Sequence, residues 1–117
     1  MGDHGMSDAK AQLAVVKGRI GELTKALPET ARSFQGLTKA AKTDGALSGA
    51  QKELVAVTIA VSKGCEGCIL YHIEAAKKLG AKRDELLEMM SVAVEMGGGP
   101  AMVYASQALD AFDAMEA

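Results

Sequence analysis

The sequence contains little of what builds β-rich proteins. Aromatic residues make up 3% of the 117 residues, tryptophan is absent, and proline and cysteine occur twice each. A core without large aromatic side chains must be built from Ala, Leu, Val, Ile and Met, and this composition favours helices over strands. We therefore expect an all-α protein.

A large excess of charge and a long apolar run are also missing. Thirteen Lys and Arg against fifteen Asp and Glu give a net charge of −2, so we expect no nucleic acid or anionic lipid as a partner. The longest apolar run, residues 54–61, is far shorter than the roughly 18 residues that a membrane span needs. Residues 1–5 lack the apolar stretch of a secretory signal, which favours a cytoplasmic location.

The length suits one domain. We expect residues 1–6 to form a disordered tail and residues 7–117 a single helical domain, with Ser7 as the first N-cap. Apolar residues recur at helical spacing in six segments separated by Gly, Pro or Asp, which predicts a bundle of six helices. These segments are residues 7–26, 29–42, 48–63, 65–79, 84–96 and 101–115.

Local signals define the ends of the central helices. Ser48 followed by Gln51 is the capping-box pattern that starts a helix. Gly64 is expected to end that helix, and Gly80 is expected to end the next one. Residues 97–100, Gly-Gly-Gly-Pro, are predicted to be a tight connection rather than a phosphate-binding loop, because no strand precedes them.

Two cysteines and a histidine form the most informative pattern. Cys65, Cys68 and His72 lie at positions i, i+3 and i+7 of a predicted helix, which share one face, and Ala76 and Leu79 continue that face towards the core. The N–H groups and dipole at a helix start favour a thiolate. The histidine, one turn after the second cysteine, could accept its proton. A sulfenic acid on one cysteine would have the other as its resolving partner.

Glu53 is a charged residue on a helix face of small apolar residues. If the helices before and after Gly64 form an antiparallel hairpin, Glu53 faces roughly residues 72–75. It should then contact His72, orient its tautomer and relay its proton, and desolvation should raise the pKa of the carboxyl group. Taken alone, Glu53 could instead be a charge that complements the helix dipole.

The four residues Glu53, Cys65, Cys68 and His72, in the pattern E-x(11)-C-x-x-C-x-x-x-H, resemble the alkyl hydroperoxidase D-like members of the carboxymuconolactone decarboxylase family. The similarity covers about residues 47–109 and includes the stretches 78–81 and 98–101. It implies the all-helical fold of that family and assembly into a homotrimer or homohexamer.

The resemblance also implies a function. It points to an oxidoreductase, a thiol-dependent antioxidant peroxidase or disulfide oxidoreductase without a cofactor. Cys68 would meet the hydroperoxide, Cys65 would resolve it, and Glu53 and His72 would form the proton relay. A lipoyl or thioredoxin-like dithiol protein would restore the thiols. The best-known peroxidase of the family has a further histidine where this chain has Gly67, which leaves the substrate open.

Other interpretations of the same residues remain. The cysteines could be structural thiols, or they could bind zinc together with His72 and Glu53, although the spacing is not that of common zinc sites and we expect no metal. A lyase of the wider family is a third alternative. In thioredoxin-like sites the first cysteine is the nucleophile, which would exchange the roles of Cys65 and Cys68.

Overall fold

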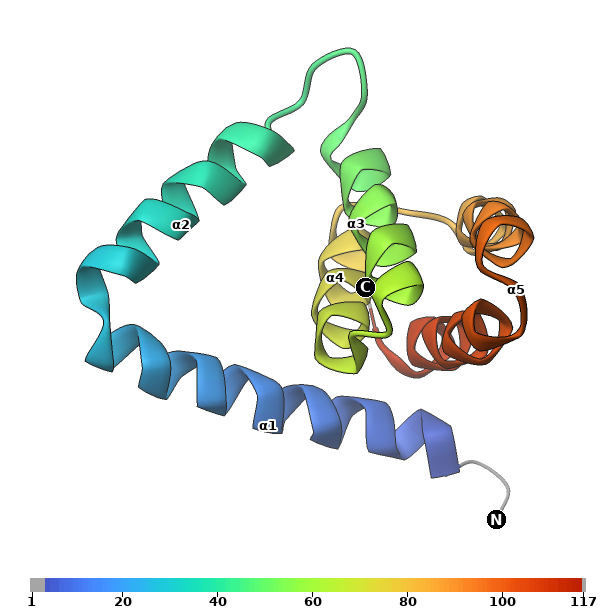
Figure 1. The fold of residues 1–117 in the computed structure, drawn as a ribbon, viewed down its shortest axis with the longest axis horizontal. Helices are drawn as coiled ribbons and strands as arrows, with labels where there is room; N and C mark the ends of the chain where they lie inside the picture. Colours follow the sequence, from blue (N-terminus) through green and yellow to red (C-terminus); the bar gives the residue numbers. More distant parts are fainter. Residues whose placement is uncertain (1–3, 117) are drawn as a thin grey trace.

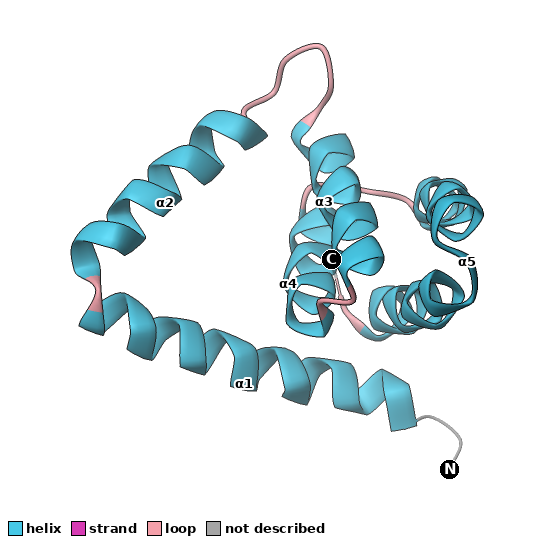
Figure 2. Ribbon diagram, in the orientation of Figure 1, coloured by secondary structure: helices cyan, strands magenta, loops and turns pink. Residues whose placement is uncertain are grey.

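The computed structural model describes residues 4–116. It contains five helices, which are α1 (His4–Ala26), α2 (Pro28–Lys42), α3 (Gly49–Lys63), α4 (Glu66–Lys78) and α5 (Arg83–Ala114). No strand occurs in this part of the chain (Figure 2), so the predicted all-α fold is confirmed. Of the helices in residues 4–116, none is both long and apolar enough to cross a membrane.

Helices α3, α4 and α5 form the body of the molecule (Figure 1). They supply its largest fully buried side chains, which are Leu54, Val57 and Val61 from α3, Ile69 and Ile73 from α4, and Leu86 from α5. The first part of α1 packs on this body through Ala9 and Leu13, which are both buried. The core therefore consists of aliphatic side chains, as the composition requires.

Residues 18–42, which we call the arm, project from the body (Figure 1). Helix α2 has no buried residue, and Phe34 and Leu37 on its apolar side are 66% and 65% exposed. In α1, Ile20 and Leu23 are exposed as well. The arm thus shows the apolar periodicity of a packed helix without a partner for it within the described residues of this chain.

The predicted break at residues 97–100 is smaller than expected. Only Gly98 has a non-helical backbone, with φ 71° and ψ −150°, a region that is essentially restricted to glycine. Helix α5 folds back there into two segments (Figure 1), and Arg83 in the first makes two hydrogen bonds of 2.9 and 3.1 Å to Asp113 in the second. The structure therefore has five helices where six were predicted, because Pro100 suits the start of a helix and the helix resumes at once. The two segments of α5 on either side of Gly98 correspond to the last two predicted helices.

The signals at α3 act as predicted. Ser48 Oγ accepts the Gln51 N–H at 3.1 Å, and Gln51 Oε1 accepts the Ser48 N–H at 2.9 Å. Gly64 ends α3 with φ 68°. A Cβ at that position would lie 3.2 Å from the Tyr104 ring, so glycine serves both the turn and the close packing.

Two details at helix ends differ from expectation. Helix α1 begins at His4, three residues before the predicted cap Ser7, and residues 1–3 of the predicted tail lie outside the described residues. Leu79 was expected to face the core but is 57% exposed. That expectation is wrong because α4 ends at Lys78 and Leu79 occupies the C-cap, where the helical face no longer continues.

Candidate active site

The two cysteines lie at the start of α4. Because the left-handed turn at Gly64 reverses the chain, Cys65 becomes the N-cap of α4 and Cys68 lies in its first turn. Their Cα atoms are 5.3 Å apart and the side chains form a disulfide; this separation is in the ordinary range for a disulfide. The pair can therefore be oxidised within the native backbone.

The environments of the two sulfur atoms differ. Cys68 is exposed, whereas Cys65 is partly buried. The Sγ atom of Cys65 accepts the backbone N–H of Cys68 at 3.3 Å. A hydrogen-bond donor and the positive end of the helix dipole both favour a thiolate, so the N-cap position suits Cys65 as a thiolate.

Glu53 and His72 form a second pair. The carboxylate comes from α3 and the imidazole from α4, and Glu53 Oε1 lies 2.7 Å from His72 Nδ1. The predicted contact across the hairpin is thus confirmed. Glu53 is 7% exposed, and among residues 8–116 it is the one charged residue that is buried. His72 lies four residues after Cys68, one turn further on the same side of α4.

A lysine that the sequence did not reveal also contacts Glu53. Lys42 at the end of α2 places its Nζ 3.0 Å from the second carboxylate oxygen of Glu53, Oε2. The signal that could have found it is indirect. A buried carboxylate needs partners for both oxygens, and one imidazole serves only one of them, so a second donor was to be expected.

The prediction that the pKa of Glu53 is raised is wrong. Burial, the largest influence, does raise the pKa, but the hydrogen bonds and charges of His72 and Lys42 together outweigh it. The pKa of Glu53 therefore lies below its ordinary value of 4.5. The expectation failed because it included desolvation and left out the lysine.

Gly67, between the cysteines, lies beneath α1. A Cβ at this position would meet the two γ-methyl groups of Val16 at 3.4 and 3.5 Å. A methyl group would fit at this distance, but an imidazole would have to pass around Val16 or displace it. The packing of α1 on α4 thus accounts for a small residue at this position.

The zinc alternative would require three or four of the candidate residues to converge. Across the described residues, no group of three or more His, Cys, Asp or Glu side chains is arranged to hold a metal ion. The four candidates are arranged instead as a disulfide and a hydrogen-bonded acid–imidazole pair.

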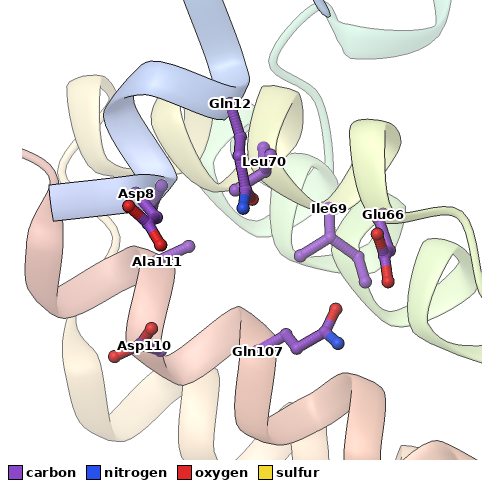
Figure 3. A pocket seen from close by; sticks show the side chains of 9 residues that line it. Asp8, Gln12, Glu66, Ile69, Leu70, Gln107, Asp110 and Ala111 are labelled. Carbon is purple, nitrogen blue, oxygen red and sulfur yellow. The ribbon is translucent and has the colours of Figure 1, made fainter. Parts of the chain in front are cut away.

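A cavity of about 250 Å³ lies on another side of α4, between α1 and α5 (Figure 3). Glu66, Asp8 and Asp110 bring three carboxylates to its rim, and the apolar side chains of Ile69 and Leu70 form part of its wall. None of the four candidate residues lines it. The carboxylates would repel an anionic ligand, and neither cysteine lines the cavity.

The sequence of this chain is similar to a family model and to known proteins. The model of the carboxymuconolactone decarboxylase family matches residues 28–111, a region that includes Lys42 and all four candidate residues. An uncharacterised protein of Cupriavidus necator is 45% identical over 111 residues, which cover 95% of this chain and 98% of that protein. Uncharacterised protein 4 in the cox locus of Paracoccus denitrificans is 34% identical over 97 residues, which cover 83% and 87%.

A solved structure agrees in fold. The crystal structure of an apo carboxymuconolactone decarboxylase family protein from Legionella pneumophila has a TM-score of 0.87 and 42% sequence identity to this chain. The match covers 91% of this chain and 95% of that one.

Proposed function

Because the chain belongs to the carboxymuconolactone decarboxylase family, we propose that it is an oxidoreductase of the alkyl hydroperoxidase D-like type. It reduces a hydroperoxide and cycles between two thiols and the Cys65–Cys68 disulfide. The observation that carries this proposal is the disulfide across the first turn of α4, on the helix that also presents His72 one turn later.

The oxidative half-reaction begins at Cys68. His72 accepts the thiol proton, and the Cys68 thiolate attacks the terminal peroxide oxygen. The O–O bond breaks, Cys68 becomes a sulfenic acid, and the alkoxide leaves as an alcohol after taking a proton from His72 or from water. The Cys65 thiolate then attacks the sulfenic sulfur, which forms the disulfide and releases hydroxide, protonated to water.

The reductive half-reaction restores the thiols. One thiolate of a dithiol protein, lipoyl or thioredoxin-like, attacks Cys68 Sγ and displaces Cys65 as a thiolate. The second thiol of the reductant then attacks the mixed disulfide, and Cys68 leaves. The reductant ends as a disulfide, so the two electrons that reduced the peroxide come from it. Such a dithiol pool is typical of the cytoplasm, where we predict the protein acts.

The assignment of roles rests on exposure and hydrogen bonding. Cys68 is the more exposed of the two residues, so we expect a peroxide or a partner protein to meet it first. Cys65 accepts the Cys68 N–H, which stabilises it as the leaving thiolate. This hydrogen bond would also support the thioredoxin-like order, in which Cys65 attacks, so the order of the two cysteines needs a direct test.

The resemblance and the exposed apolar side chains together support an oligomer, a homotrimer or homohexamer. Phe34 and Leu37 of the arm are mostly exposed, as are Val92 and Met96 of α5. Apolar patches of this kind mark interaction surfaces in soluble proteins. We propose that copies of the chain cover them.

Mutants of the two cysteines test the proposal. The wild type should lose two free thiols per chain on treatment with one equivalent of an alkyl hydroperoxide, without added metal. Cys68→Ser should abolish peroxide consumption. Cys65→Ser should allow one turnover and leave a sulfenic acid on Cys68 that dimedone labels. Mass spectrometry of the labelled peptide identifies the sulfur.

Three outcomes have distinct meanings. Dimedone on Cys65 in the Cys68→Ser variant, with none on Cys68 in the converse variant, would reverse the order of the cysteines. A reduced wild type that consumes hydroperoxide no faster than a free thiol would contradict a peroxidase. Stoichiometric zinc, with thiols that react only after a chelator is added, would favour the metal-binding alternative.

A further inference from the structure

Glu53 is a buried carboxylate with both oxygens engaged. His72 Nδ1 lies 2.7 Å from Oε1, and Lys42 Nζ lies 3.0 Å from Oε2. The Lys42 side chain is 22% exposed and that of Glu53 is 10% exposed. An ion pair so well shielded from water is held more firmly than a surface pair.

The connection between α2 and α3 fixes the position of Lys42. Lys52 Nζ donates to the carbonyl oxygen of Thr43 at 2.6 Å, and Asp44 Oδ1 accepts the backbone N–H of Gly49 at 2.5 Å. Both bonds join the residues that follow α2 to the first turns of α3. The last residue of α2 is thereby aimed at Glu53, although no residue of α2 is buried.

The side chains of Lys42, Glu53 and His72, from three helices, meet at this point, and the protonation state of each restricts that of its neighbour. The groups that act on Glu53 are His72 from α4 and Lys42 from α2. The ammonium has donors only, so it favours Glu53 as an anion. An ionised carboxylate has acceptors only, so the nitrogen of His72 that bonds it must carry a proton.

We propose that Lys42 is a positioning residue of the active site, which holds Glu53 as an anion and thereby fixes His72 in the tautomer with the proton on Nδ1. The other ring nitrogen, Nε2, then carries the lone pair and is the atom that accepts the thiol proton. Glu53 orients the base and stays charged throughout the cycle instead of carrying a proton itself. The use of Nε2 in catalysis rests on the proposed peroxidase function, whereas the tautomer does not.

Two substitutions and one control separate this role from simple packing. Lys42→Met removes the charge and keeps an unbranched side chain. Lys42→Arg keeps the charge and should rescue the site. Lys39→Met, one turn earlier on the same helix at an exposed position, controls for the loss of a positive charge from α2.

The first measurement is nuclear magnetic resonance of the reduced protein with ¹⁵N-labelled histidine. In the wild type, the neutral imidazole of His72 should carry its proton on Nδ1. In Lys42→Met, the Nε2–H tautomer should appear, and a ¹³C titration should show a higher pKa for the Glu53 carboxyl. Lys39→Met and Lys42→Arg should behave as the wild type does. Equal tautomer populations in the wild type and in Lys42→Met would overturn the proposal.

The second measurement is the pH profile of hydroperoxide consumption. Lys42→Met should be slower at neutral pH by about tenfold, less than the loss of a whole general base, which costs about 10²–10⁴-fold. A shifted tautomer in a protein without peroxidase activity would keep the role of Lys42 and refute the proposed function. An unchanged tautomer in an active peroxidase would refute the role of Lys42 and keep the function.

Discussion

The body and the arm use the same kind of amphipathic helix with opposite results. Helix α3 buries six of its residues, and α2 buries none. Yet α2 ends in Lys42, which bonds the one charged residue that α3 buries. A helix that buries none of its residues thus supplies a charge to a helix that buries six, so burial alone is a poor guide to which residues contact the candidate site.

The largest expected difference between the two regions is in stability. Ile73→Ala in the body removes a side chain that is 0% exposed, and it should lower the free energy of unfolding by about 2–5 kcal/mol. Phe34→Ala in the arm removes a side chain that is 66% exposed, and at low protein concentration it should change that free energy by less than about 0.5 kcal/mol. Urea unfolding followed by circular dichroism measures both.

Protein concentration sharpens this test. If copies of the chain cover the arm, the loss of stability caused by Phe34→Ala should grow with protein concentration. The loss caused by Ile73→Ala should not change with protein concentration. Light scattering should show wild-type particles several times heavier than the 12.1 kDa chain. A monodisperse monomer at micromolar concentration would contradict the oligomer.

An intermediate effect is expected at the fold-back of α5 within the body. Gly98→Ala places a side chain on a backbone with φ 71° and ψ −150°, which should cost about 1–3 kcal/mol. Gly99→Ala is the matched control, because nothing lies within 4 Å of a Cβ there. The control should be neutral or stabilising by up to about 1 kcal/mol. Equal effects at both positions, measured by thermal unfolding, would show that the break does not depend on glycine.

The smallest expected effect is the pH dependence of stability that Glu53 contributes. Because His72 and Lys42 lower its pKa below 4.5 against the effect of burial, the unfolded chain binds a proton at a pH where the native site does not. This contribution is complete above about pH 4.5 and is lost as the pH falls through the native pKa. In urea unfolding at a series of pH values, Glu53→Gln should show a flatter acid limb than the wild type.

The exposed Glu88→Gln serves as the control for this pH series. It should keep the slope of the wild type. If Glu53→Gln keeps that slope too, Glu53 does not titrate differently in the native and unfolded states, and the arm does not act on the body through Lys42.

Much of the body could be predicted from local rules. The Ser48 capping box, the turn at Gly64 and the contact between Glu53 and His72 all follow from residues close in sequence, whose geometry a helical hairpin sets. The charge of Lys42 could not be placed in this way. Its position depends on the angle at which α2 leaves the α2–α3 connection, which is set by hydrogen bonds such as Lys52 to Thr43 and has no periodic signal.

The break in α5 shows a different limit. The run of three glycines and a proline correctly indicated a change of direction, but one residue, Gly98, accomplishes it. Which glycine takes the unusual backbone depends on how the two segments pack. The hydrogen bond from Arg83 to Asp113 joins the two segments across a separation of 30 residues. A contact between residues so far apart in sequence cannot be predicted from a local pattern.

The left-handed turn at Gly64 also bears on the order of folding. It brings Glu53 and His72 together over a separation of 19 residues, and short loops cost less entropy to close and fold faster than long ones. The α3–α4 hairpin can therefore form while the arm and the second segment of α5 are still unattached. We expect native-state hydrogen exchange to be slowest in α3 and α4 and fastest in α2. Partial unfolding of the arm would then keep the two sulfur atoms close enough to form the disulfide again.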